Sequence, residues 1–159
     1  MKMKKWFGLL ILGLALIVLA ACGQKSPEDI IKTELKDSYS GSSELRAYES
    51  FFNSGGDRLK FDPSKEQISN SNGEVVYFKT VPKSELPSQP SGVLTSLEEE
   101  LDNTDNFTIV ISSRREQLDT SDSYYQVSLS DGGKTIRIIE LRRNHFTEGG
   151  FYDFSGESK

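Results

Sequence analysis

The chain has 159 residues, a formal net charge of −5, one histidine and one cysteine. This length accommodates one globular domain of ordinary size. The acidic balance argues against nucleic acid as a partner, because binding to phosphates needs a basic face. With a single cysteine, no disulfide can form within the chain, so stability must come from the hydrophobic core.

The first 21 residues have the three parts of a secretory signal peptide. Lys2, Lys4 and Lys5 form a positive start, an apolar run interrupted only by glycines covers 6–19, and small residues follow at 20–21. This order is typical of an export signal. The apolar run is shorter than the roughly 20 residues that a membrane-spanning helix requires. An uncleaved membrane anchor is the less favoured interpretation.

The end of this leader carries a more specific signal. Leu19-Ala20-Ala21-Cys22, followed by Gly23, resembles the lipobox of bacterial lipoproteins. The resemblance covers only residues 1–23. It implies cleavage before Cys22, a diacylglycerol thioether on the Cys22 sulfur and, in some members, an additional N-acyl chain. The expected location is therefore the outer face of a cell membrane, and the absence of disulfides favours a Gram-positive envelope.

Cleavage at this position would leave residues 22–159. Three of the 19 basic residues and none of the 24 acidic ones lie in the leader, so the mature net charge would be −8. We expect a signal peptide at 1–21, a lipidated tether at 22–28, a single globular domain at 29–154 and a flexible tail at 155–159.

Two helices are expected at the start of the domain. Ser26-Pro27-Glu28-Asp29 has the capping serine, the first-turn proline and the acidic residues of a helix start. A second helix is predicted over 44–52, because Leu45, Tyr48, Phe51 and Phe52 would share one side, with Gly55-Gly56 ending it.

The remaining pattern is mainly that of strands. Alternation and turn residues predict strands over 58–61, 67–68, 74–81, 107–112, 123–130 and 134–141, with an edge strand over 150–154. A short helix is predicted over 93–101. The expected fold class is α+β, with one or two N-terminal helices packed on an antiparallel sheet of about five to six strands.

Catalytic and metal sites are not expected. His145 is the sole histidine, no free cysteine or second histidine stands beside it, and no Gly-x-Ser-x-Gly motif occurs. The acidic turn at 102–106 lacks the glycine and the final glutamate of a calcium loop. We therefore predict neither a metal nor a cofactor apart from the acyl chains.

Five arginines in the last third are the candidate anion-binding or partner-binding residues: Arg114, Arg115, Arg137, Arg142 and Arg143. Two pairs stand at predicted strand ends, and neighbouring ends would give a guanidinium cluster suited to carboxylate or phosphate. The alternative is that arginines at strand ends are solvated and discourage edge pairing.

Six aromatic residues also lie late in the chain: Tyr124, Tyr125, Phe146, Phe151, Tyr152 and Phe154. A place in the core is favoured over outward-facing contact surfaces. The predicted function is a non-enzymatic, lipid-anchored interaction or accessory module of the envelope. Its partner would be an envelope protein or an anionic wall polymer. The alternatives are an envelope hydrolase with an acid-based site, a solute-binding lipoprotein, and a leader that serves as a peptide pheromone precursor.

Overall fold

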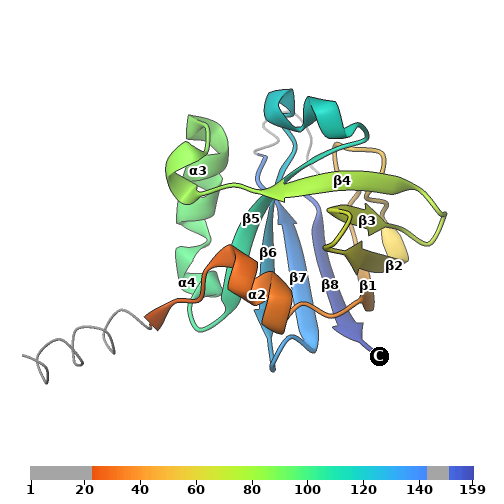
Figure 1. Ribbon diagram of the computed structural model, residues 1–159, viewed down its shortest axis with the longest axis horizontal. Helices are drawn as coiled ribbons and strands as arrows, with labels where there is room; N and C mark the ends of the chain where they lie inside the picture. The colour runs from red at the N-terminus through yellow and green to blue at the C-terminus, as the bar shows by residue number, and fades with distance from the viewer. Residues whose placement is uncertain (1–22, 143–150) are drawn as a thin grey trace, which may run out of the picture.

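The protein is an antiparallel β-barrel of eight strands, seen in a computed structural model that describes residues 23–142 and 151–159. Neighbouring strands in the barrel are also neighbours in the chain, and β8 returns to β1. Element labels follow Figure 1. The strands are β1 (Ser38–Ser43), β2 (Gly55–Asp62), β3 (Gln67–Ser69), β4 (Val75–Thr80), β5 (Asp105–Ser112), β6 (Tyr124–Ser130), β7 (Thr135–Glu140) and β8 (Asp153–Ser158).

The closed barrel corrects the expected fold class. We predicted an α+β arrangement of helices on an open sheet of about five to six strands, and this prediction was wrong. The seam lies between β1 and β8, where Tyr39 pairs with Ser158 and Gly41 pairs with Gly156. Because β8 also pairs with β7, residues 155–158 belong to the barrel and are not a frayed tail.

The helices are short and lie outside the barrel wall. They are α2 (Pro27–Thr33), α3 (Ser88–Ser96), α4 (Glu98–Leu101) and the 3-10 turns η2 (Lys83–Glu85) and η3 (Arg115–Thr120). The predicted first helix is confirmed as α2, with the Ser26 side chain accepting from the backbone N–H of Asp29. The helix predicted over 93–101 is present but divided between α3 and α4. Figure 1 shows α3 and α4 on one flank of the barrel.

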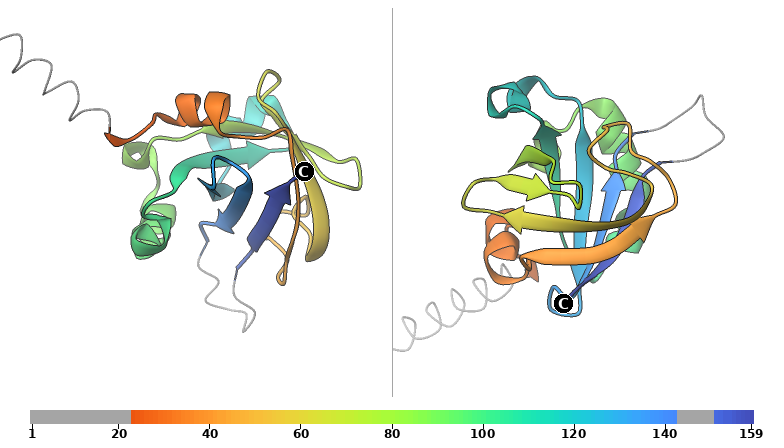
Figure 2. Two further views of the ribbon diagram at one scale, coloured as in Figure 1. Left: turned by 90° about the horizontal axis from the view of Figure 1, so that it is seen from below. Right: turned by 90° about the vertical axis from the view of Figure 1, so that its right-hand side faces the viewer.

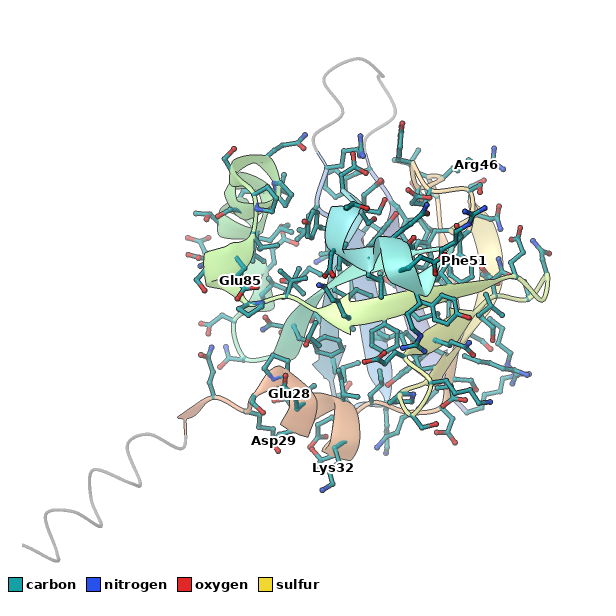
Figure 3. All side chains as sticks on the ribbon, turned by 45° about the horizontal axis from the view of Figure 1, so that its top comes forward. Glu28, Asp29, Lys32, Arg46, Phe51 and Glu85 are labelled. Carbon is teal, nitrogen blue, oxygen red and sulfur yellow. The ribbon has the colours of Figure 1, made fainter. Side chains whose placement is uncertain are left out.

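The helix predicted over 44–52 is not formed. This stretch is an irregular loop between β1 and β2, hereafter the β1–β2 loop (44–54). Figures 1 and 2 place it at the end of the barrel opposite α2, the end that also carries η3. We call this the loop end. In Figure 3, Arg46 of this loop and Lys32 of α2 lie at opposite ends of the molecule.

The barrel interior is filled by side chains that alternate along the strands. One large cluster contains Tyr39, Leu59, Ile109, Val127 and Phe154, and Ile30 of α2 joins it at the end away from the loops. An eight-stranded barrel is just wide enough for side chains to fill it or for one small ligand. A second apolar cluster holds α3 and α4 against Ile139 and Leu141. Among the described residues, no helix has the length and hydropathy needed to cross a bilayer.

Candidate functional site

The barrel interior changes character toward the loop end. Asp57 continues the inward-facing row of Leu59 and Phe61 on β2, and Glu140 continues the row of Ile136 and Ile138 on β7. Both carboxylates are buried. Burying a carboxylate is costly unless hydrogen bonds or a positive charge compensate it. Polar inward positions at one end of an otherwise apolar barrel therefore mark the candidate site.

A row of three residues crosses the barrel wall at this level. Tyr125 on β6 is directly opposite Glu140 on β7. The Glu140 N–H in turn donates to the carbonyl of Tyr152, just before β8, at 3.0 Å. Side chains directly opposite each other on neighbouring strands are in contact range. The two tyrosines therefore flank Glu140, and their ring centroids are 6.4 Å apart.

The Glu140 carboxylate is held by backbone donors. One oxygen accepts from the Tyr48 N–H at 3.0 Å and the other from the Tyr152 N–H at 3.4 Å. Burial raises the pKa of Glu140, and the two N–H donors partly oppose this change. A carboxyl group in such surroundings resists ionisation more than an exposed one does.

Three buried oxygens near this row have no hydrogen-bond partner among the described residues. They are the hydroxyls of Tyr125 and Tyr152 and Oδ2 of Asp57. Burial raises the pKa of both tyrosines; the next cause is the charge of Glu140 for Tyr125 and that of Asp57 for Tyr152. Asp57 Oδ1, by contrast, accepts from the N–H and hydroxyl of Ser71. An unsatisfied buried polar group costs about 1–3 kcal/mol, so each one calls for an explanation.

The β1–β2 loop covers this site. Phe52 is fully buried, and its ring lies 4.7 Å from that of Tyr125 and 4.9 Å from that of Tyr152, measured between centroids. Phe51 packs against Phe52 at 4.8 Å. The loop therefore closes the barrel by inserting aromatic rings against the two tyrosines.

Few polar contacts fasten this loop to the rest of the barrel. The Tyr48 N–H donates to Glu140, the Ser123 hydroxyl donates to Glu49, and the Asn70 side chain donates to the carbonyl of Phe51. These are single hydrogen bonds and not a strand ladder. Burial of Ala47, Phe51 and Phe52 in the main core therefore supplies most of the loop's attachment.

The outer surface of the loop end carries exposed aromatic groups. Tyr48 is 70% exposed, and the Arg142 guanidinium lies over its ring at 3.9 Å from the centroid. Phe151 is 37% exposed and lines an open hollow with Arg137 and Asp153. Exposed aromatic and arginine side chains are the residue types enriched at protein interfaces.

The described candidate arginines do not form a cluster. Arg115 pairs with Glu66 and lies over the Tyr77 ring, and Arg142 pairs with Asp122 at 3.2 Å. Arg137, on the barrel wall, forms two hydrogen bonds to Asp153, at 2.8 and 2.7 Å, and one to Glu100. Arg114 stands in the loop before η3. Acidic partners thus neutralise three of these arginines locally, and their anion-binding role stays a prediction.

Several predicted residues lie outside the described part of the chain. These are Leu19, Ala20, Ala21 and Cys22 of the predicted lipobox, together with Arg143, His145 and Phe146. Within 23–142 and 151–159, no group of three or more histidine, cysteine or acidic side chains is arranged to hold a metal ion.

Sequence reasoning missed Asp57, Glu140 and the β1–β2 loop as parts of one site. Alternation on the predicted strand 134–141 would have placed Glu140 on the same face as Ile136 and Ile138, which was the available signal. Of the late aromatics, Tyr125, Tyr152 and Phe154 are in the core as favoured, whereas Phe151 is exposed.

Comparisons with known proteins leave the family of the domain open. No protein-family model, no curated protein and no solved structure matches the chain. Function is therefore inferred from the residues and their geometry.

Proposed function

We propose that the chain is an extracytoplasmic bacterial lipoprotein, anchored by diacylglycerol on Cys22, that acts as a binding module of the cell envelope. The observation that carries the proposal is the resemblance of Leu19-Ala20-Ala21-Cys22-Gly23 to a lipobox, directly after a basic start and a short apolar run. Two acyl chains hold a protein stably at a membrane, because each buried methylene contributes about 0.8 kcal/mol.

The fold supports a defined orientation for such a module. Residues 23–26 lead directly into α2, at the end opposite the β1–β2 loop. Lys25 in this segment pairs with Glu34 at 2.6 Å and with Asp105 at 3.3 Å. Four residues span at most about 14 Å. An anchor on Cys22 would therefore keep α2 close to the bilayer and turn the loop end toward the envelope space.

The binding role follows from what the loop end would display. The exposed rings of Tyr48, which the Arg142 guanidinium overlies, and of Phe151 offer aromatic contacts to a partner. Because Arg115, Arg137 and Arg142 already have acidic partners, an envelope protein suits this surface better than an anionic wall polymer. The barrel interior is filled by its own side chains, which disfavours a role as a solute carrier.

Replacing the anchoring residue tests this proposal. Cys22→Ala should abolish incorporation of labelled fatty acid and remove the protein from the membrane fraction. Ser26→Ala, which changes only the cap of α2, is the matched control and should remain labelled. A labelled Cys22→Ala protein would refute the anchor.

One observation favours the second candidate function, an envelope hydrolase with an acid-based site. Raised pKa values of buried carboxyl groups are typical of general acids, and burial raises the pKa of Glu140. Glu140→Gln should then abolish release of products from envelope polymers by the purified protein. Equal activity in both proteins would eliminate Glu140 as the acid.

A further inference from the structure

An open cleft lies at the end of the barrel that carries α2. It consists of two adjoining hollows, of about 380 and 490 Å³, which share part of their lining. The shared residues come from the segment before α2, from η2 and α3, and from the chain that begins β5: Gly23, Gln24, Lys83, Leu94, Thr104 and Asn106. Figure 1 shows α2 and α4 beside the start of β5. Each hollow is within the size range of ligand sites.

The floor of this cleft is a part of β5 that has no neighbour on one side. The ladder between β4 and β5 ends at the pair of Thr80 and Ile109, although β5 begins before this point. One further bond joins the Val81 N–H to the carbonyl of Thr108 at 2.9 Å. Pro82 follows, which has no N–H, and the chain continues from it into η2. The first residues of β5 are therefore left without a β4 partner.

Asn106 is the residue whose main chain this gap leaves free. In an antiparallel sheet, alternate residues of a strand form hydrogen bonds to the neighbours on its two sides. The Ile111 N–H donates to Ser123 toward β6, whereas the Thr108 carbonyl accepts from the β4 side. Asn106 therefore directs its N–H and C=O toward the β4 side, where no bond reaches them from the described residues. An unpaired strand edge of this kind is a template for another extended chain.

A row of amide and hydroxyl side chains fixes this edge. The Thr108 hydroxyl donates to Gln126 Oε1 at 2.6 Å, and Gln126 Nε2 donates to Asn106 Oδ1 at 2.8 Å. Asn106 Nδ2 in turn donates to the carbonyl and to the hydroxyl of Thr104, both at 3.2 Å. All four residues line the cleft. The edge is thus held in an extended form before a ligand arrives, which lowers the entropic cost of binding.

The charges around the cleft favour a basic ligand. Lys25 already pairs with Asp105 at 3.3 Å. Lys83 pairs with Glu98 of α4. Asp102 also lines the cleft and forms no ion pair with a described residue. The acidic side chains of the lining therefore outnumber the basic ones, and complementary charge steers a cationic partner to such a site.

We propose that this cleft binds an extended peptide segment with a basic side chain, which is added to β5 beside Asn106. The main chain of the peptide pairs with the free N–H and C=O of Asn106, and the charge of Asp102 attracts the basic side chain. The inference goes beyond the proposed function, since it assigns a second binding surface at the end opposite the loop end. An anchor on Cys22 would place this surface next to the membrane, because Gly23 and Gln24 line the cleft.

The test is a titration of the full chain, purified in detergent, with the capped peptide acetyl-Val-Thr-Lys-Thr-Val-amide and NMR as the readout. The expected result is saturable shifts of the amides around Asn106, with slower hydrogen exchange of the Asn106 N–H, which gains a partner. The same peptide with every backbone nitrogen methylated has no main-chain donor and should bind at least about tenfold more weakly.

Three outcomes would overturn the proposal. They are the absence of saturation with the capped peptide, equal binding of the methylated peptide, and saturation by the disaccharide chitobiose instead of the peptide, which would assign the cleft to carbohydrate. Cys22→Ala protein should bind the peptide as the wild-type chain does, so the result does not depend on lipidation.

A variant of the rim tests the charge. Asp102→Asn removes the unpaired charge with little change of shape, and it should weaken binding of the lysine peptide about two- to fivefold without lowering the melting temperature. Glu99→Gln, on α4 but outside the lining, is the matched control and should bind as the wild-type chain does. A peptide with glutamate in place of lysine should bind the wild-type chain more weakly. Equal binding of the lysine and glutamate peptides would overturn the assignment of a basic ligand.

Discussion

At the scale of single residues, the polar end of the barrel carries groups that lower the stability of the fold. Asp57 Oδ2 and two tyrosine hydroxyls are buried without partners in the described structure, an arrangement that reduces stability. Proteins retain such groups most often where a function uses them. By comparison, the hydroxyl of Tyr39 at the other end of the barrel donates to the carbonyl of Gly133 at 2.7 Å and is satisfied.

Glu140 makes stability depend on pH in a defined direction. Burial raises its pKa above the ordinary value of 4.5, so the folded state binds a proton more tightly than the unfolded state does. The contribution of this group is most favourable below about pH 4.5 and is lost as pH rises through the folded pKa. The free energy of unfolding of Glu140→Gln, relative to the wild-type chain, should therefore increase between pH 4 and pH 7.

Urea denaturation at the two pH values measures this difference. The difference should have a positive sign, because the wild-type chain loses stability as Glu140 ionises whereas the glutamine does not titrate. Glu28→Gln, on the exposed surface of α2, is the control and should show no such change. A constant difference between Glu140→Gln and wild type would contradict the account of this carboxyl group.

At the scale of elements, most of the strands could be predicted and the covering loop could not. Period-two alternation and turn residues revealed the strands that became β2 to β7. The stretch 44–52 has apolar residues at helical spacing, yet Phe51 and Phe52 are both buried in the barrel mouth and the chain between them and β1 is irregular. The buried positions of Phe51 and Phe52 depend on tertiary contacts with Tyr125 and Tyr152, and such contacts cannot be read from the local sequence pattern.

Phe52→Ala tests whether this loop closes the barrel. Removing a fully buried phenylalanine side chain costs about 3–5 kcal/mol, and we expect a loss in this range. Tyr48→Ala, in the same loop but at a side chain that is 70% exposed, should cost no more than about 1 kcal/mol. Chemical denaturation of both variants provides the comparison. Equal losses would mean that the Phe52 ring does not fill the barrel mouth.

At the scale of the whole molecule, closure of the sheet is the feature that sequence analysis missed. β1 reads Ser-Tyr-Ser-Gly-Ser-Ser, which has few of the β-branched and aromatic residues typical of strands. Position 41 requires glycine for a steric reason, because a Cβ there would lie 2.0 Å from the backbone oxygen of Ser155 in β8. Gly41 thus permits the seam and at the same time weakens the sequence signal for strand β1. The segment that forms β8 was predicted as an edge strand followed by a flexible tail.

Gly41→Ala should therefore damage the barrel as a whole. The contact it creates is with backbone and cannot be relieved by a side-chain rotation, so we expect a loss of about 3 kcal/mol or more in the free energy of unfolding. Gly56→Ala, on the neighbouring strand, is the control, since its nearest contact would be at 3.9 Å. Hydrogen exchange of the β8 amides should rise only in Gly41→Ala. Equal protection in the two variants would contradict a closed β1–β8 seam.

The proposed orientation of the barrel depends on the proposed lipid anchor at Cys22, which would decide which end of the barrel meets a partner. The most direct test is the intact mass of the wild-type protein isolated from the membrane fraction of a bacterium that expresses it. The predicted result is a chain that begins at Cys22 and carries a diacylglycerol, with or without a further acyl chain. A chain that retains residues 1–21, or one that begins near Cys22 without lipid, would contradict it.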